Sequence, residues 1–215
     1  MTASYQEQFN KVFAQLQNEG LLLLSDADFP NVPNLITGER IRGSWWTHDR
    51  AQEIFVVSEM LEDHPDVMTI KLLSGKVTFV YRELWNRVYA IGLAREEWQL
   101  KKLPANAAEL LKVLDKTGSI QTNKVGKQFG PKPGETAREL ELRLLIHARQ
   151  VHGESGAHTK ILETWPAWAK RVGYRARSNS APAARRFLEE HVARINNEHG
   201  AAARLPWSSN TRKPR

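Results

Sequence analysis

The chain contains no cysteine among its 215 residues. This absence excludes disulfides, cysteine metal ligands and cysteine nucleophiles, and it is typical of proteins kept in a reducing compartment. Residues 1–18 also lack the basic start and the apolar stretch of a secretory signal peptide. The sequence therefore predicts a cytoplasmic protein.

Long apolar runs are missing as well. Residues 20–24 and 54–57 are the longest candidates, and both fall far short of the roughly 20 residues that a membrane helix needs. We therefore expect no association with a membrane. The hydrophobic fraction of 41% is nevertheless enough for a buried core, so the chain should fold on its own.

Several motifs that mark common enzyme classes are absent too. The chain has no P-loop, no glycine fingerprint for dinucleotides, no nucleophile elbow and no His-Glu-x-x-His. Nucleotide hydrolysis, hydride transfer and serine-hydrolase chemistry are thereby disfavoured. We expect no cofactor, and the sequence leaves open whether the protein is an enzyme.

Positive charge is concentrated near the C-terminus of a chain whose formal net charge is +7. Residues 1–169 hold 20 basic and 21 acidic side chains, whereas residues 170–215 hold 11 basic and 3 acidic ones. Basic side chains favour polyanions, because each one placed on a phosphate releases condensed counterions. The pattern predicts that residues 169–215 form a basic arm that binds nucleic acid. A solvated tail that only aids solubility would have the same composition.

The expected arm has little regular structure. Apolar spacing predicts one short helix near residues 182–197, and residues 204–215 are expected to be disordered. The candidate nucleic-acid contacts in the arm are Arg171, Arg175, Arg177, Arg185 and Arg186.

The rest of the sequence predicts an α+β fold, which begins with a unit of helices and one hairpin in residues 1–100. Apolar side chains at helical spacing predict helices over residues 5–16, 49–61 and 82–91. Two β-branched runs surround the turn Ser74-Gly75-Lys76, which predicts a β-hairpin over residues 67–81. We expect this hairpin to pack against the helices.

Residues 104–168 have the element order of a winged-helix-like module. A leucine-rich helix is predicted over residues 104–116, followed by a Gly turn, a capping Thr or Asn, and a second helix from Glu135. Two strands around a Gly-flanked turn, which resembles a wing, are then predicted at residues 144–152 and 158–165. In the alternative interpretation the second helix continues through Val151.

Basic side chains of this module are candidate DNA contacts, namely Lys124, Lys132, Arg138 and Arg143. The two arginines would lie on the helix offered to the major groove. Alternatively, Arg143 forms an ordinary surface pair with Glu139, four residues before it in the chain. His152 and His158 would flank the turn of the hairpin and contact the nucleic-acid backbone.

The same two histidines, together with His147, raise the question of a metal site, since neutral imidazole is a common zinc ligand. Their gaps of five and six residues match neither the His pair of a zinc-protease helix nor the carboxylate motif of a di-iron bundle. The sequence therefore predicts no metal site.

The most unusual segment is RGSWWTH, which runs from Arg42 to His48. Two adjacent tryptophans lie near the expected start of a helix, whose free N–H groups attract anions. In one interpretation a base stacks on Trp45 while a phosphate is held by Arg42, Ser44 or His48. In the other, both rings fill the core. We expect Trp46 in the core and Trp45 at the surface, because neighbours at a helix start point about 100° apart.

Five stretches carry a family resemblance: Gly43-Ser44-Trp45-Trp46, LEDHPDV at 61–67, Lys71-Leu72, GKVTF at 75–79 and Glu163-Thr164-Trp165. Over residues 35–168 the chain resembles a family of uncharacterised bacterial proteins that has the Gly-Ser-Trp-Trp motif. This resemblance implies no activity. Residues 104–165 are also loosely similar to winged-helix modules, including those of bacterial DNA-repair glycosylases, but no active-site residue carries over.

These features together predict a nucleic-acid-binding protein whose expected partner is DNA. An alternative is a DNA-repair enzyme, a glycosylase or a nuclease, in which acid-base work falls to His48 and either Glu59 or Glu163. A third hypothesis is an adaptor whose basic tail docks on an acidic protein.

Overall fold

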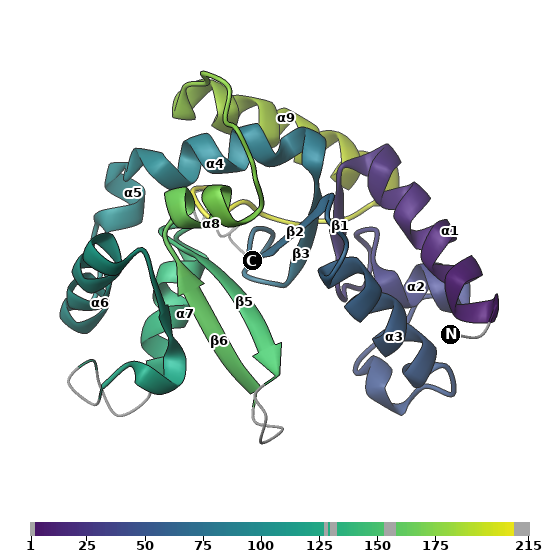
Figure 1. Ribbon diagram of the computed structural model, residues 1–215. Helices are drawn as coiled ribbons and strands as arrows, with labels where there is room; N and C mark the ends of the chain where they lie inside the picture. The colour runs from purple at the N-terminus through teal and green to yellow at the C-terminus, as the bar shows by residue number, and fades with distance from the viewer. Residues whose placement is uncertain (1–2, 127–128, 130–132, 153–157, 209–215) are drawn as a thin grey trace, which may run out of the picture.

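A computed structural model describes residues 3–126, 129, 133–152 and 158–208 of the chain. The chain is a mixed α+β protein in which helices surround two antiparallel sheets of three strands each (Figure 1). The predicted α+β class is confirmed. Over these ranges, every helix is too short or too polar to cross a membrane.

The first sheet consists of β1 (Leu21–Leu23), β2 (Val67–Ile70) and β3 (Thr78–Tyr81), with β3 in the centre. β2 and β3 pair antiparallel, as predicted for the hairpin. Ser74 and Gly75 turn the chain with φ values of 52° and 69°, a region that glycine adopts without strain. β1 is an unpredicted third strand, which follows the first helix directly.

Helices cover both faces of this sheet. In chain order the helical segments of the N-terminal half are α1 (Ala3–Glu19), α2 (Val32–Thr37), η1 (Trp45–Thr47), α3 (Ala51–Glu62), η2 (Arg82–Leu84) and α4 (Trp85–Ala94). Alternate strand residues point to opposite faces. Leu22 and Phe79 therefore pack on the side of α1 and α3, whereas Leu21 and Val80 pack on the side of α4.

The C-terminal region is folded against the rest of the chain, so the prediction of a projecting arm is wrong for the described residues. It contains α8 (Trp165–Arg171) and α9 (Ala181–His199). The helix predicted near residues 182–197 is confirmed. α9 lies along α4 at the top of Figure 1 and buries Leu188, Val192 and Ile195 in the core shared with the first sheet. The apolar side chains at helical spacing in α9 are therefore part of the core.

The segment that follows α9 is also attached to the body. The side chain of Leu205 is buried, and the backbone of Arg204 exchanges hydrogen bonds with Ser74 in the hairpin turn. The expected disorder is therefore wrong for residues 204–208. Residues 209–215 lie outside the described ranges.

The second sheet belongs to the part of the chain between α4 and α8. Its elements in chain order are α5 (Glu97–Leu100), α6 (Ala105–Thr117), β4 (Ser119–Gln121), η3 (Thr122–Lys124), α7 (Pro133–Leu142), β5 (His147–His152) and β6 (His158–Glu163). β6 lies between β4 and β5 and runs antiparallel to both. Leu110, Leu114 and Leu140 fill a separate core between the helices and this sheet.

Of the two interpretations of residues 144–165, the pair of strands is confirmed. α7 ends at Leu142, and Leu144 takes a left-handed conformation with φ of 53°, which a continuing helix does not permit. The predicted turn of the hairpin includes residues 153–157, which lie outside the described residues.

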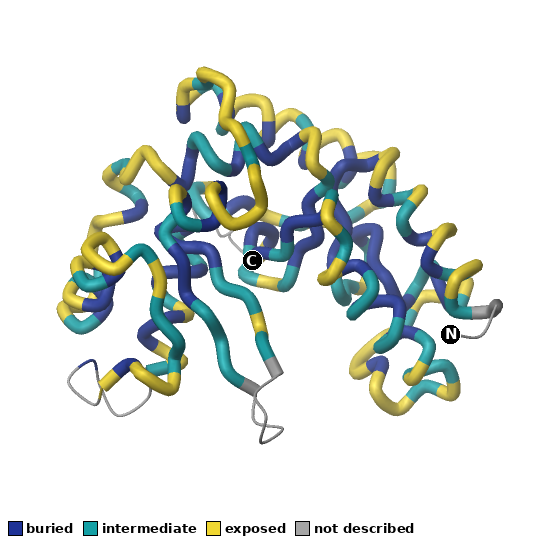
Figure 2. Tube along the Cα trace, in the orientation of Figure 1, coloured by how far each residue is buried: buried dark blue, intermediate teal, exposed yellow. Residues whose placement is uncertain are grey.

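Trp165 joins the two sheets. Its indole N–H donates a hydrogen bond of 2.8 Å to the carbonyl oxygen of Leu144, just before β5. The same ring lies against Gly92 of α4, where an added Cβ would collide with the indole. In Figure 2 the strands of the first sheet are almost wholly buried, whereas those of the second sheet are largely intermediate and much of α9 is exposed. The contact between α4 and α8 is thus closely packed.

Gly92→Ala should destabilise the protein by roughly 1–3 kcal/mol, because the new methyl group overpacks the site of the Trp165 ring. Gly134→Ala is the matched control. Gly134 lies in α7 with open space around its Cα, so alanine there should be neutral or stabilising by up to about 1 kcal/mol. Urea unfolding measures both variants. Equal stabilities of the two variants would contradict the close contact at Gly92.

Candidate functional site

The tryptophan pair has the reverse of its expected exposure. Trp45 is only 6% exposed and packs in the core with α1 and α3, whereas Trp46 is 60% exposed. The two rings stack with centroids 3.9 Å apart, and Trp46 also lies beside Phe55. The 3-10 turn of η1 lets Trp46 fold back over its neighbour, so the prediction that Trp45 is a surface platform is wrong.

The other candidates in this segment have different surroundings. Arg42 and Ser44 are exposed. Both ring nitrogens of His48 have partners nearby: Nε2 lies 3.1 Å from Glu39, and Nδ1 accepts the backbone N–H of Arg50 at 3.0 Å. His48 is therefore held by its own loop.

The basic candidates around α7 fall into two classes. Lys124 and Arg138 are exposed. Arg143, in contrast, donates hydrogen bonds to the carbonyl oxygens of Gln99 and Lys101, at 3.2 and 2.9 Å, and so holds the end of α5. These hydrogen bonds hold Arg143 to the backbone, which argues against the expected DNA contact. The alternative pair is present, since Nε of Arg143 lies 3.7 Å from Glu139.

Three of the predicted contacts lie partly or wholly outside the described part of the chain. His152 and His158 face each other as the last backbone pair of the β5–β6 hairpin, and the structure describes their backbone only. Lys132 lies outside the described residues. The structure thus shows the pairing of the two strands up to His152 and His158, and the expected wing stays a prediction.

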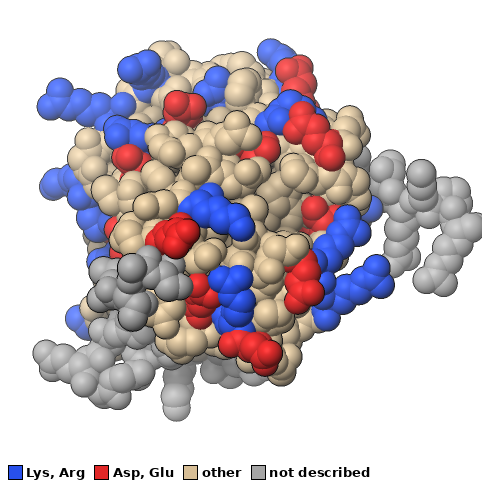
Figure 3. Space-filling model, turned by 90° about the vertical axis from the view of Figure 1, so that its right-hand side faces the viewer, with Lys and Arg blue, Asp and Glu red and all other residues tan. Residues whose placement is uncertain are grey.

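Ion pairs engage part of the C-terminal positive charge. Arg171 pairs with Glu163, and Arg185 lies 3.2 Å from Glu96. The remaining candidates, Arg175, Arg177 and Arg186, are exposed. On the face that carries α1 and α3, basic and acidic side chains are interspersed without a continuous basic patch (Figure 3).

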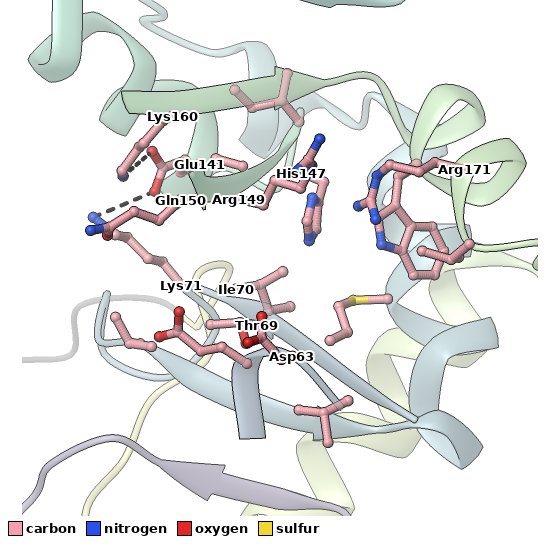
Figure 4. Close-up of a pocket in the computed structure, with 18 of the residues that line it drawn as sticks. Asp63, Thr69, Ile70, Lys71, Glu141, His147, Arg149, Gln150, Lys160 and Arg171 are labelled. Carbon is pink, nitrogen blue, oxygen red and sulfur yellow. Dashed lines mark hydrogen bonds and ion pairs between the residues drawn. The ribbon is translucent and has the colours of Figure 1, made fainter. Parts of the chain in front are cut away.

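A cleft of about 350 Å³ lies between the two sheets (Figure 4). One wall comes from β2 and the end of α3, and it includes Asp63, Thr69 and Lys71. The other wall comes from β5 and α8, and it includes His147, Arg149 and Arg171. The volume suits a small ligand. His48 and Glu59 are not among the lining residues.

A buried ionic cluster stands behind the β5 wall. Arg171 donates to both carboxylate oxygens of Glu163, at 2.8 Å each, in a bidentate arrangement. Burial alone would raise the pKa of Glu163, but the contacts with His147 and Arg171 outweigh it and lower the pKa to about 2. Glu163 is therefore ionised over the whole physiological range.

His147 is buried beside this carboxylate, with Nδ1 3.4 Å from Oε2 of Glu163. Burial lowers the pKa of His147; Glu163 opposes this effect, while the positive charges of Arg171 and Arg149 add to it. The imidazole is therefore neutral at physiological pH. A neutral imidazole has one N–H, and the neighbouring carboxylate, which can only accept, favours this N–H on Nδ1.

A second ionic group bridges the walls of the cleft. The carboxylate of Glu141, on α7, lies 2.7 Å from Nζ of Lys160 and 3.5 Å from Nζ of Lys71. Lys71 follows β2, so its side chain reaches from the first sheet to the second (Figure 4). This contact links residues from the two walls of the cleft.

Sequence patterns point to His147 only as a metal candidate and to Glu163 only as a partner for His48. The pairing of Glu163 with Arg171 joins a strand and a helix eight residues apart, and no periodicity signals it. A candidate ligand set elsewhere consists of Glu19, Glu198 and His199. The guanidinium of Arg194 already neutralises its two carboxylates, at 3.0 and 2.6 Å.

No known family model, no curated protein and no solved structure matches this chain. The resemblance of residues 35–168 to a bacterial family, and of residues 104–165 to winged-helix modules, therefore stays a prediction.

Glu163→Gln should remove a large part of the acid sensitivity of the fold. A carboxyl whose pKa is lowered from 4.5 to about 2 stabilises the native state above pH 4.5, and this contribution is lost as the pH falls through 2. The shift corresponds to about 3 kcal/mol. Unfolding free energies measured by urea from pH 5 to pH 2 should fall more steeply in the wild type. Parallel curves for both proteins would refute the buried ion pair.

Proposed function

We propose that the chain binds double-stranded DNA and that residues 104–168 are a winged-helix module that makes the principal contact. The observation that carries this proposal is the topology of the second sheet. In winged-helix modules a strand after the first helix pairs with the last strand of a C-terminal hairpin, and a recognition helix precedes the hairpin.

The element order supports this interpretation. α6 is followed by β4, then by η3 and α7, and then by the β5–β6 hairpin, with β6 in the centre of the sheet. α7 stands in the position of the recognition helix. Its inner side, with Ala137 and Leu140, packs against α6, which leaves the opposite side available for a groove.

Charge supports the same surface. Arg138 is exposed on α7, and Lys124 is exposed at the end of η3. The net charge of +7 attracts a polyanion from a distance, although ion pairs engage Arg171 and Arg185.

Arg143 and the C-terminal region, which the sequence analysis made candidate DNA contacts, have other roles in this proposal. Arg143 supports the module by anchoring it to α5, since its donors are committed to backbone carbonyls. The C-terminal region contributes long-range attraction rather than an arm, because α9 is part of the core.

Arg138→Glu should weaken binding to a duplex at least tenfold and reduce the slope of log K against log salt by about 0.9 for each phosphate that the variant no longer neutralises. Arg186→Glu makes the same charge change on α9, whereas α7 lies below it in Figure 1. It should have a small effect at 150 mM salt, where the screening length is about 8 Å. Gel shifts at several salt concentrations measure both. A larger loss of affinity in Arg186→Glu would assign binding to the C-terminal region instead.

A further inference from the structure

Buried polar atoms without hydrogen-bond partners gather at the cleft between the sheets. Among the described residues five such side-chain atoms occur, and three of them belong to residues that line this cleft: Thr69 Oγ1, His147 Nδ1 and Arg149 Nε. A buried polar group that lacks a partner destabilises the folded protein. Three of them around one cavity indicate a ligand that supplies the missing partners.

Glu163 lies within ion-pair distance of two of these groups, His147 and Arg149, but accepts a hydrogen bond from neither. Its two oxygens already accept hydrogen bonds from Arg171. Arg149 Nε stands 4.0 Å from the nearer oxygen, beyond hydrogen-bond range, and His147 Nδ1 stands 3.4 Å away without hydrogen-bond geometry. The guanidinium can only donate, while the hydroxyl and the imidazole Nδ1 can donate as well as accept, so a ligand acceptor can serve all three groups.

The charge at this end of the cleft favours an anion. Arg149 and Arg171 together carry two positive charges, Glu163 carries one negative charge, and His147 is neutral. One positive charge therefore remains uncompensated within the group. Lys71 and Lys160, in contrast, already share the carboxylate of Glu141.

The opposite wall limits the size of the anion. Glu62 and Asp63 line the cleft from the end of α3 and place negative charge there. An extended polyanion would be repelled by that wall, whereas a compact ligand with one anionic group would not. Thr69 faces His147 and Arg149 from across the cleft (Figure 4), so the ligand must offer acceptors in several directions. A tetrahedral phosphate does this better than a planar carboxylate.

We propose that the cleft between β2 and β5 binds the phosphate group of a compact ligand, held by Arg149 and His147 on one wall and by Thr69 on the other. The phosphate belongs to a free small molecule or to the end of a nucleic-acid strand. The site is separate from the proposed DNA contact of α7, and the proposal of phosphate binding does not depend on DNA binding by α7.

Titration calorimetry with inorganic phosphate, at constant ionic strength and with acetate as the carboxylate comparison, tests the proposal. Wild-type protein should bind phosphate saturably and at least tenfold more tightly than acetate. Arg149→Gln should lower the phosphate affinity at least tenfold. Arg186→Gln, the same change at an exposed position of α9, should bind like the wild type.

Thr69→Val is a second variant for the same titration, which tests the proposal even if Arg149→Gln folds poorly. Valine preserves the shape of threonine and removes the unpartnered hydroxyl, so the unliganded protein should melt at the same or a higher temperature while phosphate affinity falls several-fold. Binding of one duplex with and without 5′ phosphates then distinguishes the two sources of the phosphate. If the protein prefers the phosphorylated duplex and Thr69→Val abolishes this preference, the site binds strand ends. If the protein shows no preference, the site binds the phosphate of a small molecule.

Two results would overturn the proposal: no saturable phosphate binding by the wild type, or unchanged phosphate affinity in both Arg149→Gln and Thr69→Val. Neither result bears on DNA binding by α7, because the titration contains no DNA. Conversely, if gel shifts show that Arg138→Glu binds DNA as tightly as the wild type, the proposal of phosphate binding in the cleft is unaffected.

Discussion

The packing of Trp165 against Gly92 is the contact on which the arrangement of the two sheets depends. The indole occupies space that any side chain at position 92 would fill, and its N–H is bonded to Leu144 directly before β5. α8 is thereby fixed to α4 on one side and to the second sheet on the other.

The buried group of Glu163, His147 and Arg171 shows how the fold maintains charge at the cleft between the two sheets. A carboxylate that is 4% exposed is costly to bury, and the bidentate guanidinium offsets much of this cost. The arrangement holds the guanidinium of Arg171 and a neutral imidazole in place beside Arg149. A rigid wall of donors is then available to a ligand without further ordering of the protein.

Local signals in the sequence were enough for the hairpin at residues 67–81 and for the β5–β6 hairpin, because turn residues and β-branched runs act over short distances, but they did not indicate β1 or β4. Contacts between distant segments left no such signal. Trp45 is buried because α1 and α3 enclose it, and α9 is ordered because its apolar side meets α4, so composition alone suggested an arm. The cleft joins residues 62–71 to residues 141–172, a distance in sequence that no periodicity spans.

The central claim is that α7 and the β5–β6 hairpin form the surface that meets duplex DNA. Amide chemical shifts of isotope-labelled protein, followed while a short duplex is added at 150 mM salt, locate that surface directly. The account predicts that the largest changes fall on α7 and on β5 and β6, with little change on α9. Largest changes on α9, or on the exposed Trp46 and its neighbours, would contradict it.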